Sequence, residues 1–234
     1  MIAGTGRGVR VAVIDSGVHA GHPHVNGVAG GVGFDVEGHA HGDYVDRLGH
    51  GTAVTAAIKD LAPDVEVYAV KVFDRQLSTN ITCLINAIEW AAREQAHVIN
   101  LSLGTPRCEH EAALRGAMAV AAAAGALVVA AREDAGVAYL PGSLAGALAV
   151  DVDWTCPRGE YRIAYAGGVT VLRTSGLPRQ IPGVPAERNL QGVSFAVANA
   201  TAFVARAMED PAVRTREQVL RRLADAAPVR SGDE

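Results

Sequence analysis

Short apolar runs recur along the chain and are separated by longer, more polar stretches. The runs are rich in valine and isoleucine, which is typical of buried strands in parallel sheets. The strands expected from this pattern are residues 9–15 (VRVAVID), 65–73, 97–103 (HVINLSL), 127–131, 147–152 and 161–164.

The stretches between these runs carry apolar residues at helical spacing. Residues 79–95, for example, carry Leu84 and Ile88 one turn apart. Because strands and helices alternate, the pattern predicts an α/β fold with a mostly parallel sheet covered by helices on both faces. Further helices are expected at residues 53–61, 109–124 and 215–226.

A serine opens one more predicted helix, which runs from Gly192-Val193-Ser194 to about residue 208. A helix N-terminus surrounds such a serine with backbone N–H donors and the positive end of the helix dipole. Ser194 alone is more simply explained as a helix cap than as a nucleophile. The apolar residues expected on one buried face are Phe195, Ala198, Ala202, Val204 and Ala205.

Length and composition indicate one large domain. The chain has 234 residues, of which 49% are hydrophobic, enough for one sizeable core. We expect a single domain over residues 1–234, with its core at about 9–208 and a C-terminal helix and polar tail at 209–234. The net charge is −4 with both signs mixed, which favours neither nucleic acid nor an anionic membrane as a partner.

Three features favour a cytoplasmic location. Residues 112–131 are the most apolar run, but their alanines, glycines and one arginine favour a helix and a strand over a membrane span. Met1 leads almost at once into a strand-like run, so no secretory signal is expected in this chain. The cysteines, Cys83, Cys108 and Cys156, form no C-x-x-C pair and suit a reducing compartment.

Residues 19–49 form an irregular segment rich in glycine and histidine. Metal binding is one interpretation, because imidazole and carboxylate are zinc ligands. The spacing matches no familiar ligand frame, so solvated loop histidines are the favoured interpretation and no metal is expected. The residues concerned are His19, His22, His24, His39 and His41 with Asp35, Asp43 and Asp46.

Asp15, His50 and Ser194 are all expected at strand ends or helix starts. One edge of a parallel sheet gathers such positions together. Serine becomes a good nucleophile when a base takes its proton, and histidine is that base near neutral pH. A carboxylate fixes the tautomer of the histidine and stabilises its charged form. The three residue types together therefore indicate nucleophilic catalysis.

Four motifs in the same order resemble those of the subtilases, the subtilisin-like serine peptidases. They are VAVIDSGVHAGHP around Asp15, GHGTAV around His50, VINLSLG at residues 98–104 and GVSFA around Ser194. The resemblance implies a subtilisin-like three-layer sandwich in which Asp15, His50 and Ser194 form the catalytic triad. The Asp, His, Ser order along the chain is the one found in subtilisin.

The resemblance also implies how a substrate is held. Ser102, Leu103 and Gly104 would pair with an extended peptide as an added strand. The end of the strand at residues 127–131 would form the other wall of the pocket for the residue before the scissile bond. The residues expected in this wall are Ala130, Ala131 and, directly after the strand, Arg132.

One departure from the family concerns the oxyanion region. Subtilases normally read AAGN where this chain has Ala130-Ala131-Arg132-Glu133. In subtilisin itself, loss of that asparagine costs roughly 10²–10³ in kcat. An ionised Glu133 would repel the developing charge, whereas a protonated one would donate a hydrogen bond if burial raised its pKa. The Ser194 N–H would remain as a donor. Val193, Ala198 and Ala53 also differ from the family, as smaller packing changes.

The sequence thus predicts a serine endopeptidase that forms an acyl-enzyme on a peptide or protein substrate and needs no cofactor. The trimmed loops, with no dense calcium-binding run, favour an intracellular processing role such as removal of the leader of a peptide natural product. Two alternatives stay open: an impaired subtilase homologue that binds a peptide or partner, and an acyl-transfer variant acting as a ligase or cyclase. The sequence leaves the oligomeric state open.

Overall fold

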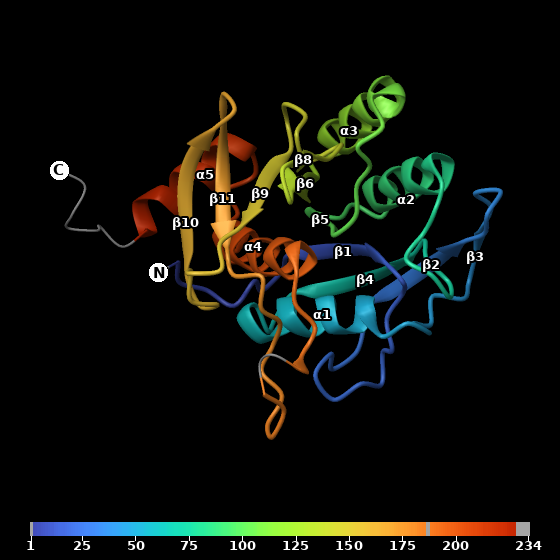
Figure 1. Ribbon diagram of the computed structural model, residues 1–234, viewed down its shortest axis with the longest axis horizontal. Helices are drawn as coiled ribbons and strands as arrows, with labels where there is room; N and C mark the ends of the chain where they lie inside the picture. The colour runs from blue at the N-terminus through green and yellow to red at the C-terminus, as the bar shows by residue number, and fades with distance from the viewer. Residues whose placement is uncertain (1, 186–187, 228–234) are drawn as a thin grey trace.

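A sheet of mostly parallel strands forms the middle layer of the structure (Figure 1). The computed structural model describes residues 2–185 and 188–227. Antiparallel pairing is confined to the two ends of the sheet, at β10–β11 and β2–β3. The strands in spatial order are β10 (Tyr161–Ala166), β11 (Val169–Thr174), β9 (Leu148–Val152), β6 (Leu127–Ala131), β5 (Val98–Leu101), β1 (Arg10–Asp15), β4 (Glu66–Lys71), β2 (Gly30–Phe34) and β3 (Ala40–His41).

Helices cover both faces of this sheet (Figure 1), which confirms the predicted α/β architecture. Alternate residues of β1 point to opposite faces, as the pleat of a strand requires. Val11 and Val13 join one hydrophobic cluster, and Ala12 and Ile14 join the other. The helices are α2 (Ile81–Arg93) and α3 (Glu111–Ala123) on one face, and α1 (His50–Leu61), α4 (Val193–Met208) and α5 (Arg216–Ala226) on the other.

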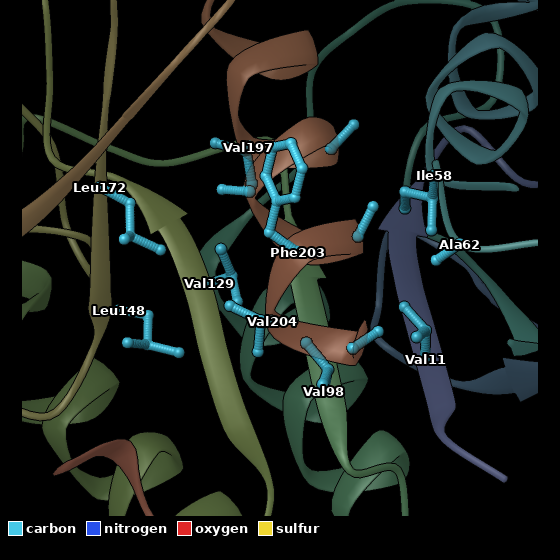
Figure 2. Packing of buried hydrophobic residues seen from close by; sticks show 14 of the residues in the cluster. Val11, Ile58, Ala62, Val98, Val129, Leu148, Leu172, Val197, Phe203 and Val204 are labelled. Carbon is cyan, nitrogen blue, oxygen red and sulfur yellow. The ribbon is translucent and has the colours of Figure 1, made fainter. Parts of the chain in front are cut away.

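Helix α4 is buried on every side, so the prediction of one buried face is wrong. Its residues from Phe195 to Met208 are all buried except Arg206. Figure 2 shows Val197, Phe203 and Val204 of this helix between β1 and α1 on one side and Leu148 and Leu172 on the other. A helix that is apolar all round belongs inside a core. Its many alanines let neighbouring elements approach closely.

The segment at residues 19–49, expected to be irregular, contains strands β2 and β3 at one end of the sheet. The sequence of β2, GGVGF, gives no apolar alternation because three of its five residues are glycine. Its parallel pairing with β4, in which Val32 lies opposite Val70, stabilises it instead. Strand β11 was not predicted either. It lies between β9 and β10 and completes this end of the sheet.

The apolar run at residues 112–131 divides into most of α3 and all of β6, as predicted. None of the helices in the described part of the chain combines the length and the apolar character needed to cross a bilayer. Helix α5 ends at Ala226, and residues 228–234 of the expected polar tail lie outside the described residues.

Substitution of Phe203 tests the importance of the α4 core. The ring of Phe203 is fully buried, with its centroid 4.9 Å from that of Tyr161. Phe203→Ala should lower the free energy of unfolding by about 3–5 kcal/mol, since it removes packing and leaves a cavity. Urea unfolding measures this loss. Tyr165→Ala is the control, because this ring is 77% exposed, and it should cost less than about 1 kcal/mol. Equal losses in the two variants would contradict the central role of α4.

Candidate active site

Three chain segments bring Asp15, His50 and Ser194 to one edge of the sheet. Asp15 is the last residue of β1, His50 is the first of α1 and Ser194 is the second of α4. Parallel strands end at the same edge, and helices that return across the sheet begin there. The neighbouring strands β5 and β6 end at this edge as well, before Ser102 and Arg132.

A short hydrogen bond joins the first two of these residues. Asp15 is fully buried, and its Oδ1 lies 2.7 Å from His50 Nδ1. The same oxygen accepts the backbone N–H of Ser16 at 2.7 Å. Because a carboxylate oxygen only accepts, Nδ1 carries the proton in this pair and leaves Nε2 as the basic nitrogen. Asp15 thus fixes both the tautomer and the orientation of the ring.

Two glycines shape the chain around these residues. Gly51 packs so tightly against the loop after Asp15 that a Cβ atom would lie 2.2 Å from the Gly17 carbonyl oxygen. Gly192, which precedes α4, has a φ of 148°, a value that residues other than glycine rarely adopt. The first glycine brings α1 against the end of β1, and the second turns the chain into α4 just before Ser194.

The environment of His50 favours its charged form. Burial of the ring lowers the pKa of His50, but the hydrogen bond and negative charge of Asp15 act in the opposite direction, with a further contribution from the charge of Asp46. The net effect is a pKa raised above the ordinary value of 6.5. A carboxylate that stabilises the imidazolium in this way also stabilises the form produced when histidine acts as a base.

Ser194 is half-buried at the start of α4, and its Oγ donates to the backbone carbonyl of Ser102 at 3.2 Å. No hydrogen bond joins Ser194 to His50 within residues 2–185 and 188–227. Both side chains line the same cavity. In free enzymes, catalytic hydrogen bonds are often long or poorly aligned and tighten when substrate binds. A rotation about χ1 moves the Ser194 hydroxyl within the cavity.

This cavity has a volume of about 650 Å³ and is the candidate substrate cleft. Ser102, Leu103, Gly104 and Ala131, which the family resemblance implied as substrate-binding residues, are among the residues that line it. The sequence analysis missed several other residues that line the cavity, because they belong to no motif. Four of these missed residues are polar or charged: Arg107, His110, Asp134 and Tyr139.

Two residues predicted for the substrate pocket, Ala130 and Arg132, and one predicted for the oxyanion region, Glu133, do not line the cleft. Ala130 is buried in the core beneath the cleft. Arg132 turns away because its guanidinium binds the carboxylate of Asp151 on β9, with Nη2 2.6 Å and Nε 3.0 Å from its oxygens. Glu133 follows it, and its Oε2 lies 3.2 Å from Arg132 Nη1. Both line a second cavity.

The expectation that Glu133 faces the oxyanion region is therefore corrected. Its side chain is 40% exposed and lines the second cavity, not the cleft that contains Ser194. A short hairpin formed by β7 (Glu133–Asp134) and β8 (Val137–Ala138) explains the change. Asp134 lines both the cleft and the second cavity, whereas Glu133 lines the second cavity and not the cleft.

A buried polar network behind Ser194 was also missed. Asn100, fully buried in β5, donates to Ser102 Oγ at 2.8 Å and accepts from Thr201 Oγ1 of α4 at 2.9 Å. This network ties the cleft wall to the helix that carries Ser194. Its sequence signal was a single asparagine inside the apolar run HVINLSL, since buried polar groups need partners.

The histidines of the 19–49 segment do not gather around one point. In the part of the chain that the structure describes, one group has ligand atoms close enough to share a metal ion, namely Asp35, Glu37 and His39. Asp35 Oδ1 already accepts the backbone N–H groups of Glu37 and His39, which are turn contacts. His19, His22 and His24 instead line a separate cavity of about 280 Å³.

An α/β protein with a carboxylate–histidine pair and a serine at the C-terminal edge of its sheet has the layout of a serine hydrolase. Comparison with known families gives a more specific result. The profile of the Subtilase family matches residues 6–152, more than half of the chain. The chain therefore belongs to the subtilase family.

Individual relatives agree with this assignment. The chain is 34% identical over 211 residues to the alkaline protease of Alkalihalobacillus alcalophilus, an alignment covering 85% of this chain and 51% of that protein. It is equally identical over 211 residues to subtilisin Savinase of Lederbergia lenta, with 85% and 72% covered. The chain thus spans about half the length of the first relative. A crystal structure of a cold adapted subtilisin-like serine proteinase shares the fold, with a TM-score of 0.72, 22% identity and coverage of 94% and 82%.

The raised pKa of His50 predicts a pH-dependent contribution to stability. A raised pKa means that the folded protein binds the proton more tightly than the unfolded chain. The contribution is therefore present below the ordinary pKa and is lost as the pH rises through the folded-state value. The difference in unfolding free energy between wild type and His50→Gln should fall as the pH rises above about 6.5.

His97→Gln provides a contrast of opposite sign in the same denaturant experiment. Burial lowers the pKa of His97, helped by the charges of Arg10 and Arg214. Its contribution is lost as the pH falls, so the difference from wild type should rise with pH. The same slope for both variants would contradict the assignment of the Asp15–His50 pair.

Proposed function

We propose that this chain is a serine endopeptidase with Asp15, His50 and Ser194 as its triad. The observation that carries the proposal is the 2.7 Å hydrogen bond from His50 to buried Asp15 in a protein that presents Ser194 to the same cavity. Membership of the subtilase family supports it.

In the proposed reaction, His50 Nε2 removes the hydroxyl proton of Ser194 as Oγ bonds to the carbonyl carbon of the substrate. The imidazolium gives that proton to the leaving nitrogen as the C–N bond breaks, which leaves the acyl group on Ser194. Water then attacks the ester carbonyl as His50 takes its proton, and His50 returns that proton to Ser194 Oγ as the C–Oγ bond breaks and the acid is released. Asp15 keeps the ring oriented and stabilises its charge throughout.

The oxyanion of this reaction needs hydrogen-bond donors. The Ser194 amide is a candidate, because it lies in the first turn of α4 and has no acceptor among the described residues. The positive end of the α4 dipole adds to it. The asparagine amide found in the family has no counterpart at Arg132 or Glu133, so we propose a slower enzyme that depends on backbone donors.

Ser102, Leu103 and Gly104 are proposed to hold an extended peptide, because they follow β5 and line the cleft. No metal or other cofactor enters the proposed mechanism. The finer role we propose is processing of a dedicated peptide substrate in the cytoplasm, supported by the short loops and by the free thiols of Cys83 and Cys108.

The second candidate is a subtilase homologue that binds peptides without cleaving them. The carboxylate of Asp134 in the cleft favours it, together with the Ser194 hydroxyl turned toward Ser102. A negative charge near the developing oxyanion opposes catalysis.

Labelling with a fluorophosphonate probe separates the two candidates. The endopeptidase should form an adduct on Ser194, located by mass spectrometry of its peptides, and His50→Ala should abolish it because the serine loses its base. His22→Ala is the matched control. It replaces a half-buried histidine outside the cleft and should leave labelling intact. No adduct at any pH from about 5 to about 9 would favour the binding protein.

The charge of Asp134 provides a second test of the cleft. Asp134→Asn removes a carboxylate from the cleft and adds amide N–H donors, so kcat on a peptide substrate should rise about tenfold. Glu133→Gln is the matched control. Its carboxylate lies in the second cavity beside Arg132, so the rate should change less than about twofold. A larger increase in the Glu133 variant would show that Glu133 faces the reacting atoms after all.

A further inference from the structure

Asp46 lies four residues before His50 and accepts an unusual number of hydrogen bonds. Its Oδ1 accepts from Ser16 Oγ at 2.9 Å and from the backbone N–H groups of Leu48 and Gly49 at 2.9 and 2.8 Å. Its Oδ2 accepts from the N–H and Oγ1 of Thr52 at 2.9 and 2.6 Å. Both oxygens are therefore used, and the donors come from three parts of the chain.

These bonds fasten the start of α1 to the end of β1. Ser16, which donates to Asp46, also accepts the Gly51 N–H at 2.9 Å and donates its own N–H to Asp15 at 2.7 Å. Thr52 Oγ1 accepts the backbone N–H of His19 at 3.0 Å. A closed set of contacts thus runs from the Asp15 carboxylate, through Ser16 and Asp46, to the residues that flank His50.

Helix α1 needs these acceptors. Its N-cap position is Gly49, which has no side chain to accept a hydrogen bond from the first turn. The first amides of a helix have no partner inside the helix. Asp46 and Ser16 supply acceptors for Thr52 and Gly51, and a negative charge at a helix N-terminus is favourable.

The carboxylate of Asp46 remains charged and acts on His50. Partial burial raises the pKa of Asp46, but hydrogen bonds from Thr52, Gly49 and Leu48 outweigh it and lower the pKa. The resulting negative charge favours the protonated form of His50, adding to the effect of Asp15.

Other charged or titratable side chains also lie around His50 and Asp46. Across the cleft, His50 is faced by Arg107, His110 and Asp134, and the α4 side contributes the uncharged ring of Phe195 at a centroid distance of 6.0 Å. On its far side, Asp46 lines the small cavity that also contains His19, His22, His24 and Arg179.

We propose that Asp46 is a positioning residue for His50. Asp46 caps the helix that carries the base, ties this helix to the loop after Asp15 and supplies a second negative charge that acts on the ring. The inference uses the proposed function only in treating His50 as the base. An ordinary helix cap would stabilise α1 without altering the protonation of His50, so the two roles can be separated by experiment.

The test is a titration of the His50 ring by NMR in wild type, Asp46→Asn and Asp43→Asn, with the His50 signal assigned from its loss in His50→Gln. Asp43 is the matched control. It lies in the same loop, with a side chain 44% exposed and paired to Arg47 at 2.8 Å. The pKa of His50 should fall in Asp46→Asn and stay at the wild-type value in Asp43→Asn.

Catalysis supplies the second readout. The rate of probe labelling or kcat at neutral pH should fall by up to about 10²-fold in Asp46→Asn, with little change in KM, because the base is displaced rather than the substrate. Thr52→Val should also slow the reaction, and Thr52→Ser should restore it by returning the hydroxyl bonded to Asp46.

The NMR titration does not depend on activity. A shift in Asp46→Asn in a protein that never labels would support the inference while the proposed function fails. An unchanged titration, equal to that of Asp43→Asn, would overturn the inference and leave Asp46 as a simple cap. If Asp46→Asn does not fold, Asp46→Ser, a short neutral acceptor, replaces it under the same criterion.

Discussion

The burial of α4 inside the molecule is the constraint on which the rest of the structure depends. This helix packs against β5, β6, β9 and β11 as well as α1 and α5. Alanines at nearly half of its buried positions let backbones approach closely, and the larger side chain of Phe203 is fully buried among them. A helix held on every side cannot slide along its axis. Its first turn, and Ser194 with it, is therefore fixed at the edge of the sheet where β1 ends.

The candidate base is held by a different kind of contact. Helix α1 begins at the surface, so hydrophobic burial alone does not fix its first residue. Polar bonds do so: Asp15 holds the ring of His50, and Asp46 with Ser16 holds the backbone around it. Nucleophile and base thus depend on separate supports, one apolar and one polar, that meet in the same cleft. Asn100 adds a polar link on the nucleophile's side, by bonding to both Ser102 of the cleft wall and Thr201 of α4.

The segment that follows β6 shows how one ion pair, between Arg132 and Asp151, decides which side chains line the cleft. Arg132 would crowd the cleft if its side chain entered it. The half-buried carboxylate of Asp151 instead draws the guanidinium away, and Glu133 goes with it. The hairpin that follows brings Asp134 into the cleft. The cleft therefore combines the candidate nucleophile and base with the carboxylate of Asp134 in its lining.

The sequence by itself determined the α/β class and most of the sheet, and it singled out three candidate residues, because valine-rich strands and short motifs are local signals. Asp15, His50 and Ser194 became candidates since each lies inside its own motif. Strands β2 and β11, the complete burial of α4 and the direction of Arg132 were decided only by tertiary structure. Each depends on a partner far along the chain, such as β4 for β2 and Asp151 for Arg132. Side-chain direction in a hairpin and the choice of an ion-pair partner leave no periodic trace in sequence, so Asp46 and Asp134 became visible only once the loops were folded together.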